Sequence, residues 1–132
     1  MAGRVLIIDD NELIRVLVAN ALSEHGFVPL VASGGAEGLA MLGTGDFDLV
    51  VVDYVMPEMM GDELIRRVRA SGHSRVRSLP ILGLTGSVPE AGSRLMAAGA
   101  DACIPKPFQD RKLVESAKRL LEARQPKGAS AA

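Results

Sequence analysis

The chain has 132 residues, of which 48% are hydrophobic and 23% are charged, and its formal net charge is −1. This length suits a single domain with a real core, and the near-neutral charge gives no general attraction to nucleic acid or to an anionic membrane. Only 3% of the residues are aromatic and there is no tryptophan, which disfavours base-stacking and carbohydrate-binding surfaces. A single cysteine cannot form an internal disulfide, and no apolar run approaches the roughly 20 residues of a membrane span, so we expect a cytoplasmic protein that makes no membrane contact.

Five short apolar runs alternate with segments of helical periodicity. The runs are residues 5–9, 27–32, 48–53, 80–85 and 100–104. The first, third and fourth are apolar almost throughout, which is typical of parallel strands covered on both faces. The second run contains Pro29 and the fifth leads into Pro105. Because proline is tolerated mainly at sheet edges, we predict that these two strands are the outer ones.

The segments between the runs predict helices, since apolar residues recur at helical spacing and glycines follow several segments as stop signals. The predicted helices are residues 11–24, 35–42, 60–70, 90–98 and 110–123, and the first has an apolar face of Leu13, Ile14, Leu17, Val18, Ala21 and Leu22. This alternation predicts an α/β fold, a doubly wound (βα)5 domain whose five parallel strands lie in the order 2-1-3-4-5 between two helical layers. We assign residues 1–124 to this domain and residues 125–132 to a disordered tail.

Acidic, hydroxyl and basic side chains follow four of the five predicted strands. Asp9 and Asp10 end the first run, and Asp53 ends the third. Thr85 ends the fourth run, and Lys106 comes shortly after the fifth. Because binding sites in such sheets form at the carboxyl ends of the strands, we expect these side chains to share one pocket.

These residue types suit phosphoryl chemistry. Three neighbouring carboxylates repel one another unless a cation lies among them, and oxygen ligands of this kind suit Mg²⁺. Lys106 would supply a positive charge to a phosphoryl oxygen, and Thr85 would supply a hydroxyl hydrogen bond. Asp53 stands alone on the central strand and is the better nucleophile, whereas Asp9 and Asp10 are placed to share the metal. The pattern therefore indicates phosphoryl transfer to a protein carboxylate.

Four motifs resemble the receiver domain of two-component response regulators, and the resemblance covers residues 4 to about 124. The motifs are "IIDDNE", "VVVDYVMPEMMGDEL", "LGLTG" and "PKPF". The resemblance implies a CheY-like, flavodoxin-like fold in which Asp53 accepts a phosphoryl group from a histidine kinase or a histidine phosphotransfer protein. The Mg²⁺ ligands that it implies are Asp9, Asp10, Asp53 and the backbone carbonyl of Val55. Thr85 and Lys106 would contact the phosphoryl group, and the bond between Lys106 and Pro107 would be cis.

The resemblance also implies how such a protein acts. We expect a bacterial signalling domain that acts through contacts with a downstream protein, as a monomer or a weak homodimer. It would catalyse only its own phosphorylation and dephosphorylation, so it is not an enzyme that turns over an external substrate. The chain ends shortly after the last predicted helix, and we therefore expect no direct DNA binding.

One residue departs from the pattern of this family, and two others occupy positions that vary within it. Cys103 lies three residues before Lys106, where receivers commonly carry a tyrosine or phenylalanine that turns inward when the hydroxyl, here Thr85, moves toward the phosphoryl group. Because cysteine has no ring to turn, we expect partner recognition to differ from that of typical receivers on the face made by the predicted helix 90–98, strand 100–104 and helix 110–123. Val55 and Ser87 occupy the two positions that set the lifetime of the phospho-aspartate. Val55 offers no polar group to orient an attacking water, which predicts no fast self-dephosphorylation.

Other interpretations remain open at this point. A receiver-like interaction scaffold that works without phosphorylation would account for Cys103, which we otherwise expect to be a small buried hydrophobe. A phosphatase with an aspartyl intermediate would need a second aspartate two residues after the nucleophile, where this chain has Val55. The arginine-rich stretch 66–77 lacks interleaved aromatic residues, and we interpret it as a solvated surface, or else as a docking surface for an acidic partner.

Overall fold

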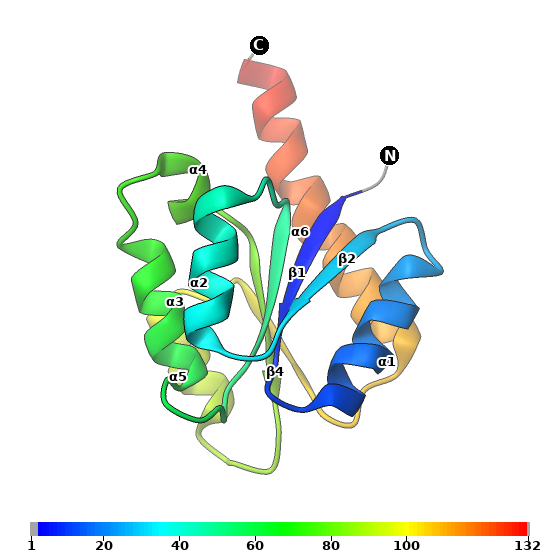
Figure 1. The fold of residues 1–132 in the computed structure, drawn as a ribbon. Helices are drawn as coiled ribbons and strands as arrows, with labels where there is room; N and C mark the ends of the chain where they lie inside the picture. The colour runs from blue at the N-terminus through cyan, green and yellow to red at the C-terminus, as the bar shows by residue number, and fades with distance from the viewer. Residues whose placement is uncertain (1–2, 132) are drawn as a thin grey trace.

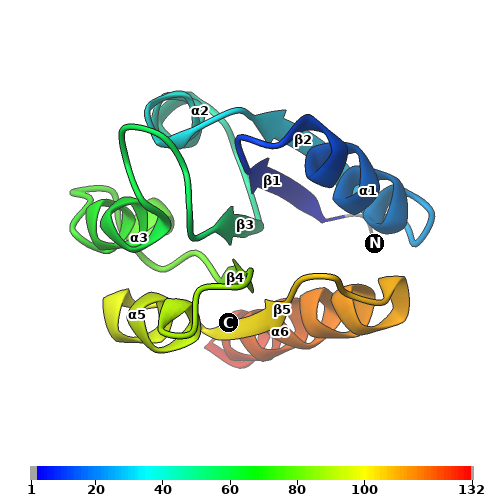
Figure 2. The ribbon, with the colours of Figure 1, turned by 90° about the horizontal axis from the view of Figure 1, so that it is seen from below.

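The computed structural model describes the backbone of residues 3–131 and the side chains of residues 3–124. Five parallel strands form one sheet in the order β2-β1-β3-β4-β5 (Figure 1 and Figure 2), which confirms the predicted α/β topology. The strands are β1 (Arg4–Ile8), β2 (Val28–Ala32), β3 (Leu49–Asp53), β4 (Ile81–Thr85) and β5 (Ala102–Pro105). The helices are α1 (Glu12–Ser23), α2 (Gly35–Thr44), α3 (Gly61–Arg69), α4 (Ser74–Arg77), α5 (Ala91–Ala98) and α6 (Asp110–Ala131).

The two strands that carry proline are the outer strands of the sheet, as the sequence predicted. Pro29 lies opposite Val5 in the register of β2 with β1, and Pro105 lies opposite Thr85 in the register of β5 with β4. Strands β1, β3 and β4 occupy the interior of the sheet. All five residues of β3 are buried, which is the physical reason for the continuous apolar run in this part of the sequence.

The helices form two layers, with α1 and α6 on one face of the sheet and α2, α3 and α5 on the other (Figure 2). Successive strand residues alternate between the two layers. Leu6 and Val50 pack into the core under α2, α3 and α5, whereas Ile7 and Val51 pack into the core under α1 and α6. Each fully buried side chain of this size contributes about 1.5–3 kcal/mol to folding, so the two cores together hold the strand ends in a fixed register.

Helix α1 buries less of its apolar face than the sequence predicted. Val18, Ala21 and Leu22 are buried, but Leu13 and Leu17 remain 64% and 46% exposed. The apolar face of α1 is wider than the part of the sheet that this helix covers. The helix is therefore where the spacing predicted it, but Leu13 and Leu17 lie outside the part of its apolar face that is buried.

Two other segments differ from the predicted elements. The four-residue helix α4 was not predicted, and none of its residues is buried. Helix α6 continues beyond the predicted end at residue 123. The predicted disordered tail, residues 125–132, overlaps the end of α6 at residues 125–131, and residue 132 lies outside the described residues. The domain boundary at residue 124 stays a prediction. Within residues 3–131, none of the helices combines the length and apolar character needed to cross a bilayer.

Candidate functional site

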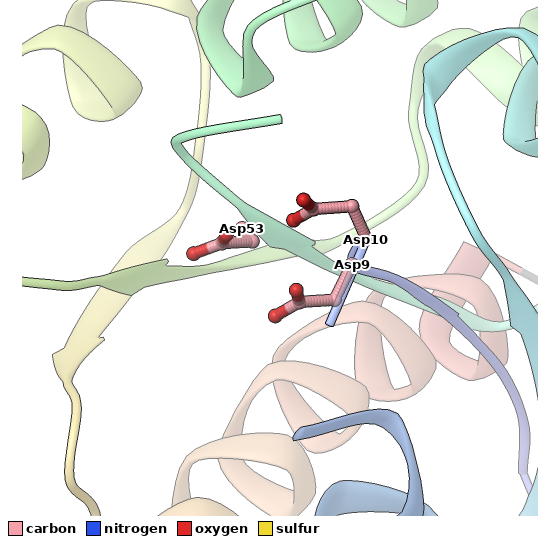
Figure 3. A group of neighbouring side chains, drawn as sticks. All are labelled: Asp9, Asp10 and Asp53. Carbon is pink, nitrogen blue, oxygen red and sulfur yellow. The ribbon is translucent and has the colours of Figure 1, made fainter. Parts of the chain in front are cut away.

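Three carboxylates converge at the carboxyl ends of β1 and β3. Asp9 and Asp10 follow β1 directly, and Asp53 is the last residue of β3. One oxygen of each carboxylate lies within 4.8 Å of the others, and the three side chains point to the same side of the sheet edge (Figure 3). Asp9 and Asp53 are buried, with 0% and 4% of their surface exposed, whereas Asp10 is exposed. The sheet topology thus brings together the acidic residues that the sequence singled out.

Lys106 reaches this cluster from the loop that follows β5. Its Nζ lies 2.9 Å from Oδ1 of Asp53 and 3.8 Å from Oδ2 of Asp9. Its backbone N–H donates to the carbonyl of Thr85 at 2.6 Å, and the peptide bond to Pro107 is cis, as the resemblance implied. One ammonium offsets only part of the repulsion among three carboxylates. The site therefore favours a further positive charge.

The buried carboxylate of Asp9 is only partly satisfied by the protein. Oδ1 accepts a hydrogen bond from the N–H of Asn11 at 2.9 Å, but Oδ2 is buried and accepts no hydrogen bond from any residue that the structure describes. A buried oxygen without a partner is costly, and an oxygen-coordinated cation would satisfy it. Burial raises the pKa of Asp9 from 3.8 to about 6; Asp53 and Asp10 act in the same direction, and the Asn11 N–H and Lys106 oppose them. This acidic cluster could hold a metal ion.

The raised pKa of Asp9 predicts that its charge destabilises the metal-free protein. The folded chain holds this proton more tightly than the unfolded chain, so stability falls as the pH rises from about 4 through about 6. The full cost above that range is on the order of 3 kcal/mol. We expect Asp9→Asn to raise the free energy of unfolding by roughly 2 kcal/mol at pH 8 and by little at pH 4. Urea titrations in EDTA at the two pH values measure this, and an equal change at both would contradict it.

A pocket opens at the acidic cluster. Of the remaining predicted residues, Val55 and Ser87 line it and Thr85 does not. The pocket is lined by Asp9, Asp10, Asn11, Asp53, Val55, Gly86, Ser87, Val88 and Lys106. Val55 and Ser87, the two positions expected to tune phospho-aspartate lifetime, are thus both at the site. Thr85 is not among the lining residues, and its hydroxyl donates to the carbonyl of Ile104 at 3.4 Å. Contact between Thr85 and a phosphoryl group stays a prediction that requires its side chain to rotate.

Cys103 lies between the sheet and α5, away from the acidic cluster. It packs against the core under α5, and its Sγ lies 4.0 Å from the carbonyl oxygen of Gly92. Burial raises the pKa of its thiol, which keeps the sulfur protonated and poorly reactive. Cys103 thus packs as a small hydrophobe, as the sequence predicted, but it is partly and not fully buried.

The loop after Asp53 contains a strained residue that the sequence did not reveal. Glu58 is exposed and has a φ of 70°, in the left-handed region that costs about 1–2 kcal/mol for residues other than glycine. We expect Glu58→Gly to raise the free energy of unfolding by roughly 0.5–1 kcal/mol, after allowance for the greater freedom of glycine in the unfolded chain. Urea unfolding measures the stability of this variant and of Glu58→Ala, in which the alanine would still adopt the strained left-handed conformation. A glycine variant no more stable than the alanine variant would exclude this source of strain.

Four of the five arginines in the arginine-rich stretch pair with carboxylates, and the fifth, Arg77, donates to the carbonyl of Ser71. The ion pairs are Arg66 with Asp62, Arg67 with Glu63, Arg69 with Asp101, and Arg75 with Asp46. Each positive charge in these pairs is already compensated by a neighbouring carboxylate. The pairing favours the interpretation of residues 66–77 as a solvated surface.

Comparison with known proteins assigns the family. Residues 5–118 match the family model described as the response regulator receiver domain. The chain belongs to this family. As predicted, it is a receiver domain of the two-component response regulators, with a CheY-like fold.

Relatives of known sequence and structure agree with this assignment. The receiver is 36% identical to response regulator MprA of Mycobacterium tuberculosis, over 98% of this chain and 55% of that protein. It therefore spans about half the length of the curated relatives that it matches. Among solved structures, chemotaxis response regulator CheY4 of Vibrio cholerae is 32% identical, with a TM-score of 0.81 over 91% of this chain and 99% of that one. NtrX of Brucella abortus is 28% identical, with a TM-score of 0.89 over 99% of this chain and 30% of that one.

Proposed function

We propose that this receiver accepts a phosphoryl group on Asp53 from a histidine kinase or a histidine phosphotransfer protein, with Mg²⁺ as the cofactor. The observation that carries the proposal is the 2.9 Å approach of Lys106 Nζ to Asp53 Oδ1 inside an acidic cluster. The proposed Mg²⁺ ligands are Asp9, Asp10, Asp53 and the backbone carbonyl of Val55. Support for a metal comes from the buried Oδ2 of Asp9, which accepts no hydrogen bond from the described residues and has only the ammonium of Lys106 at 3.8 Å.

The side chains of this pocket have distinct parts in such a transfer. A carboxylate oxygen of Asp53 would attack phosphorus, forming an O–P bond as the P–N bond of the donor phosphohistidine breaks. Lys106 would leave its ion pair with the carboxylate and hold a phosphoryl oxygen instead, as a charge fixed at the site in advance. Bound Mg²⁺ would supply the further positive charge that the phosphoryl oxygens and the carboxylates require. The domain would thus catalyse its own modification and turn over no external substrate.

Incubation with acetyl phosphate and Mg²⁺, followed by intact-protein mass spectrometry, tests the proposal. We expect the parent to gain the mass of one phosphoryl group and to lose that gain in EDTA. Asp53→Asn should show no gain. Asp46→Asn is the matched control, since Asp46 is an exposed aspartate that pairs with Arg75 and does not belong to the acidic cluster, and it should behave as the parent. No gain in the parent, from acetyl phosphate or from a phosphorylated histidine donor, would favour the phosphorylation-independent scaffold.

The apolar side chain of Val55 predicts a long-lived phospho-aspartate. Val55 is 50% exposed at the rim of the pocket and offers no hydrogen bond to a water that attacks phosphorus. We expect Val55→Asn to shorten the half-life of the phosphorylated protein by about tenfold, because an amide can orient that water. The decay of the phosphoryl mass gain after removal of acetyl phosphate measures the half-life. Slower decay in the asparagine variant would contradict this role for Val55.

The wider activity of the protein remains a proposal. We propose that the phosphorylated domain signals through contacts with a downstream protein. The absence of direct DNA binding by residues 1–132, the monomeric or weakly dimeric state and the cytoplasmic location stay predictions. For the first, the support is the compensation of the arginine-rich stretch by carboxylates.

A further inference from the structure

Arg15 reaches back from α1 to the main chain of the acidic pair. Its Nη1 donates a hydrogen bond to the carbonyl oxygen of Asp9 at 2.7 Å. The paired residues of β1 end at Ile8 on both sides of the strand, so the carbonyl of Asp9 lies just beyond the regular sheet ladder. A backbone carbonyl at such a point needs another donor, and a charged guanidinium makes a stronger hydrogen bond than a neutral group does.

This carbonyl belongs to the peptide group that joins Asp9 to Asp10. Because a peptide group is planar, a hydrogen bond that fixes its carbonyl also fixes the starting direction of the next residue. The Cα atoms of Asp9 and Asp10 lie at the two ends of this planar group, and each Cα carries one of the two carboxylate side chains. The N–H of Asn11 donates a second hydrogen bond to Asp9, to Oδ1 of its carboxylate at 2.9 Å. Arg15 is therefore placed to set the orientation from which Asp9 and Asp10 converge on Asp53.

Arg15 acts on the main chain and not as a counter-ion of the carboxylates. The pKa of Asp9 is governed by burial, by the N–H of Asn11 and by the charges of Asp53, Lys106 and Asp10. Arg15 instead affects Glu37, which lies in the first turn of α2. Hydrogen bonds from Ser33 lower the pKa of Glu37, and the charge of Arg15 lowers it to a smaller degree.

We propose that Arg15 is a positioning residue of the metal site, which holds the peptide between Asp9 and Asp10 so that their carboxylates converge on one divalent cation. The inference rests on the proposed metal-dependent function of the acidic cluster. Residues that orient metal ligands without touching the metal typically change metal affinity by about 10–100-fold when they are replaced. Loss of Arg15 should therefore weaken Mg²⁺ binding and leave the chemistry at saturating Mg²⁺ nearly intact.

Direct titration of the parent and its variants with Mg²⁺ by calorimetry tests the inference. We expect Arg15→Ala to weaken Mg²⁺ binding by about tenfold. Arg15→Lys should lose less affinity than Arg15→Gln, because an ammonium makes the stronger hydrogen bond to the carbonyl. Arg67→Ala is the matched control, since Arg67 is an exposed arginine of α3 paired with Glu63 and should bind Mg²⁺ as the parent does. The rate of phosphorylation by acetyl phosphate at saturating Mg²⁺ should stay within about twofold of the parent in all folded variants.

The possible outcomes separate this inference from the proposed function. A parent that binds no Mg²⁺ overturns both. A parent that binds Mg²⁺, with unchanged affinity in Arg15→Ala or an equal loss in Arg67→Ala, overturns the role of Arg15 alone, as does a rate defect that Mg²⁺ cannot restore. If circular dichroism shows that Arg15→Ala does not fold, the lysine and glutamine variants decide, and parent-like affinity in both overturns the inference.

Discussion

Gly61→Ala is expected to destabilise the receiver by about 3 kcal/mol and to impair phosphorylation of Asp53, because the new methyl group has no space. A Cβ at position 61 would overlap the main-chain carbonyl oxygen of Asp53 and would lie 3.0 Å from the Cα of Tyr54. Both obstacles are backbone atoms, which cannot rotate aside as a side chain can. The N–H of Gly61 also donates to the carbonyl of Tyr54 at 2.7 Å, so the turn is held closed at this point. The end of β3 would have to move, and Asp53 would move with it.

Urea unfolding and the rate of phosphorylation by acetyl phosphate together measure this effect. Gly72→Ala is the matched control, because a Cβ at Gly72 would meet no atom within 4 Å. This control should stay within about 0.5 kcal/mol of the parent. Parent-like stability and rate in Gly61→Ala would show that the turn tolerates the shift and that Gly61 does not fix the site.

Lys106→Ala is expected to lower the rate of phosphorylation by acetyl phosphate at least about 100-fold, the loss seen when one pre-placed charge or donor is removed from a transition state. Its Nζ is 2.9 Å from Asp53 and 3.8 Å from Asp9, and it comes from a loop that the N–H of Lys106 ties to β4. Without it, the negative charge that develops on the phosphoryl oxygens would meet three carboxylates with less compensation. The loss should therefore appear in the rate at saturating Mg²⁺ and acetyl phosphate.

A lysine on the surface provides the comparison for this substitution. Lys112 is exposed on α6, and Lys112→Ala should retain the parent rate. Lys106→Arg should recover only part of the activity, because a planar guanidinium cannot occupy the place of a compact ammonium. A rate in Lys106→Ala within a few-fold of the parent would assign the charge compensation to the metal alone.

The order of the strands in the sheet was predictable from the sequence, whereas the exposure of individual side chains of α1 was not. Strand β3 is buried on both faces, so its five residues form a continuous apolar run that ends at Asp53. Pro29 and Pro105 marked the outer strands. The sequence did not show that Leu13 and Leu17 are exposed, because a helical stripe indicates which residues can face a sheet but not how far the sheet extends beneath them.

The same difference applies to the site. Asp9, Asp10 and Asp53 were predictable because parallel strands end at one edge, so their order in the sheet places whatever follows them side by side. The direction of the Thr85 hydroxyl depends on the rotamer of that side chain. The hydrogen bond from Arg15 to a main-chain carbonyl depends on the orientation of α1. Neither leaves a residue pattern in the sequence.

The chemical identity of the modified residue tests the central claim most directly. Borohydride reduces an aspartyl phosphate to homoserine, so treatment of the protein after incubation with acetyl phosphate and Mg²⁺ marks the acceptor for peptide mapping by mass spectrometry. We predict homoserine at position 53 alone, and none when EDTA is present. Homoserine at position 9 or 10, or a phosphorylated parent without homoserine at position 53, would contradict the assignment of Asp53 as the phosphoryl acceptor.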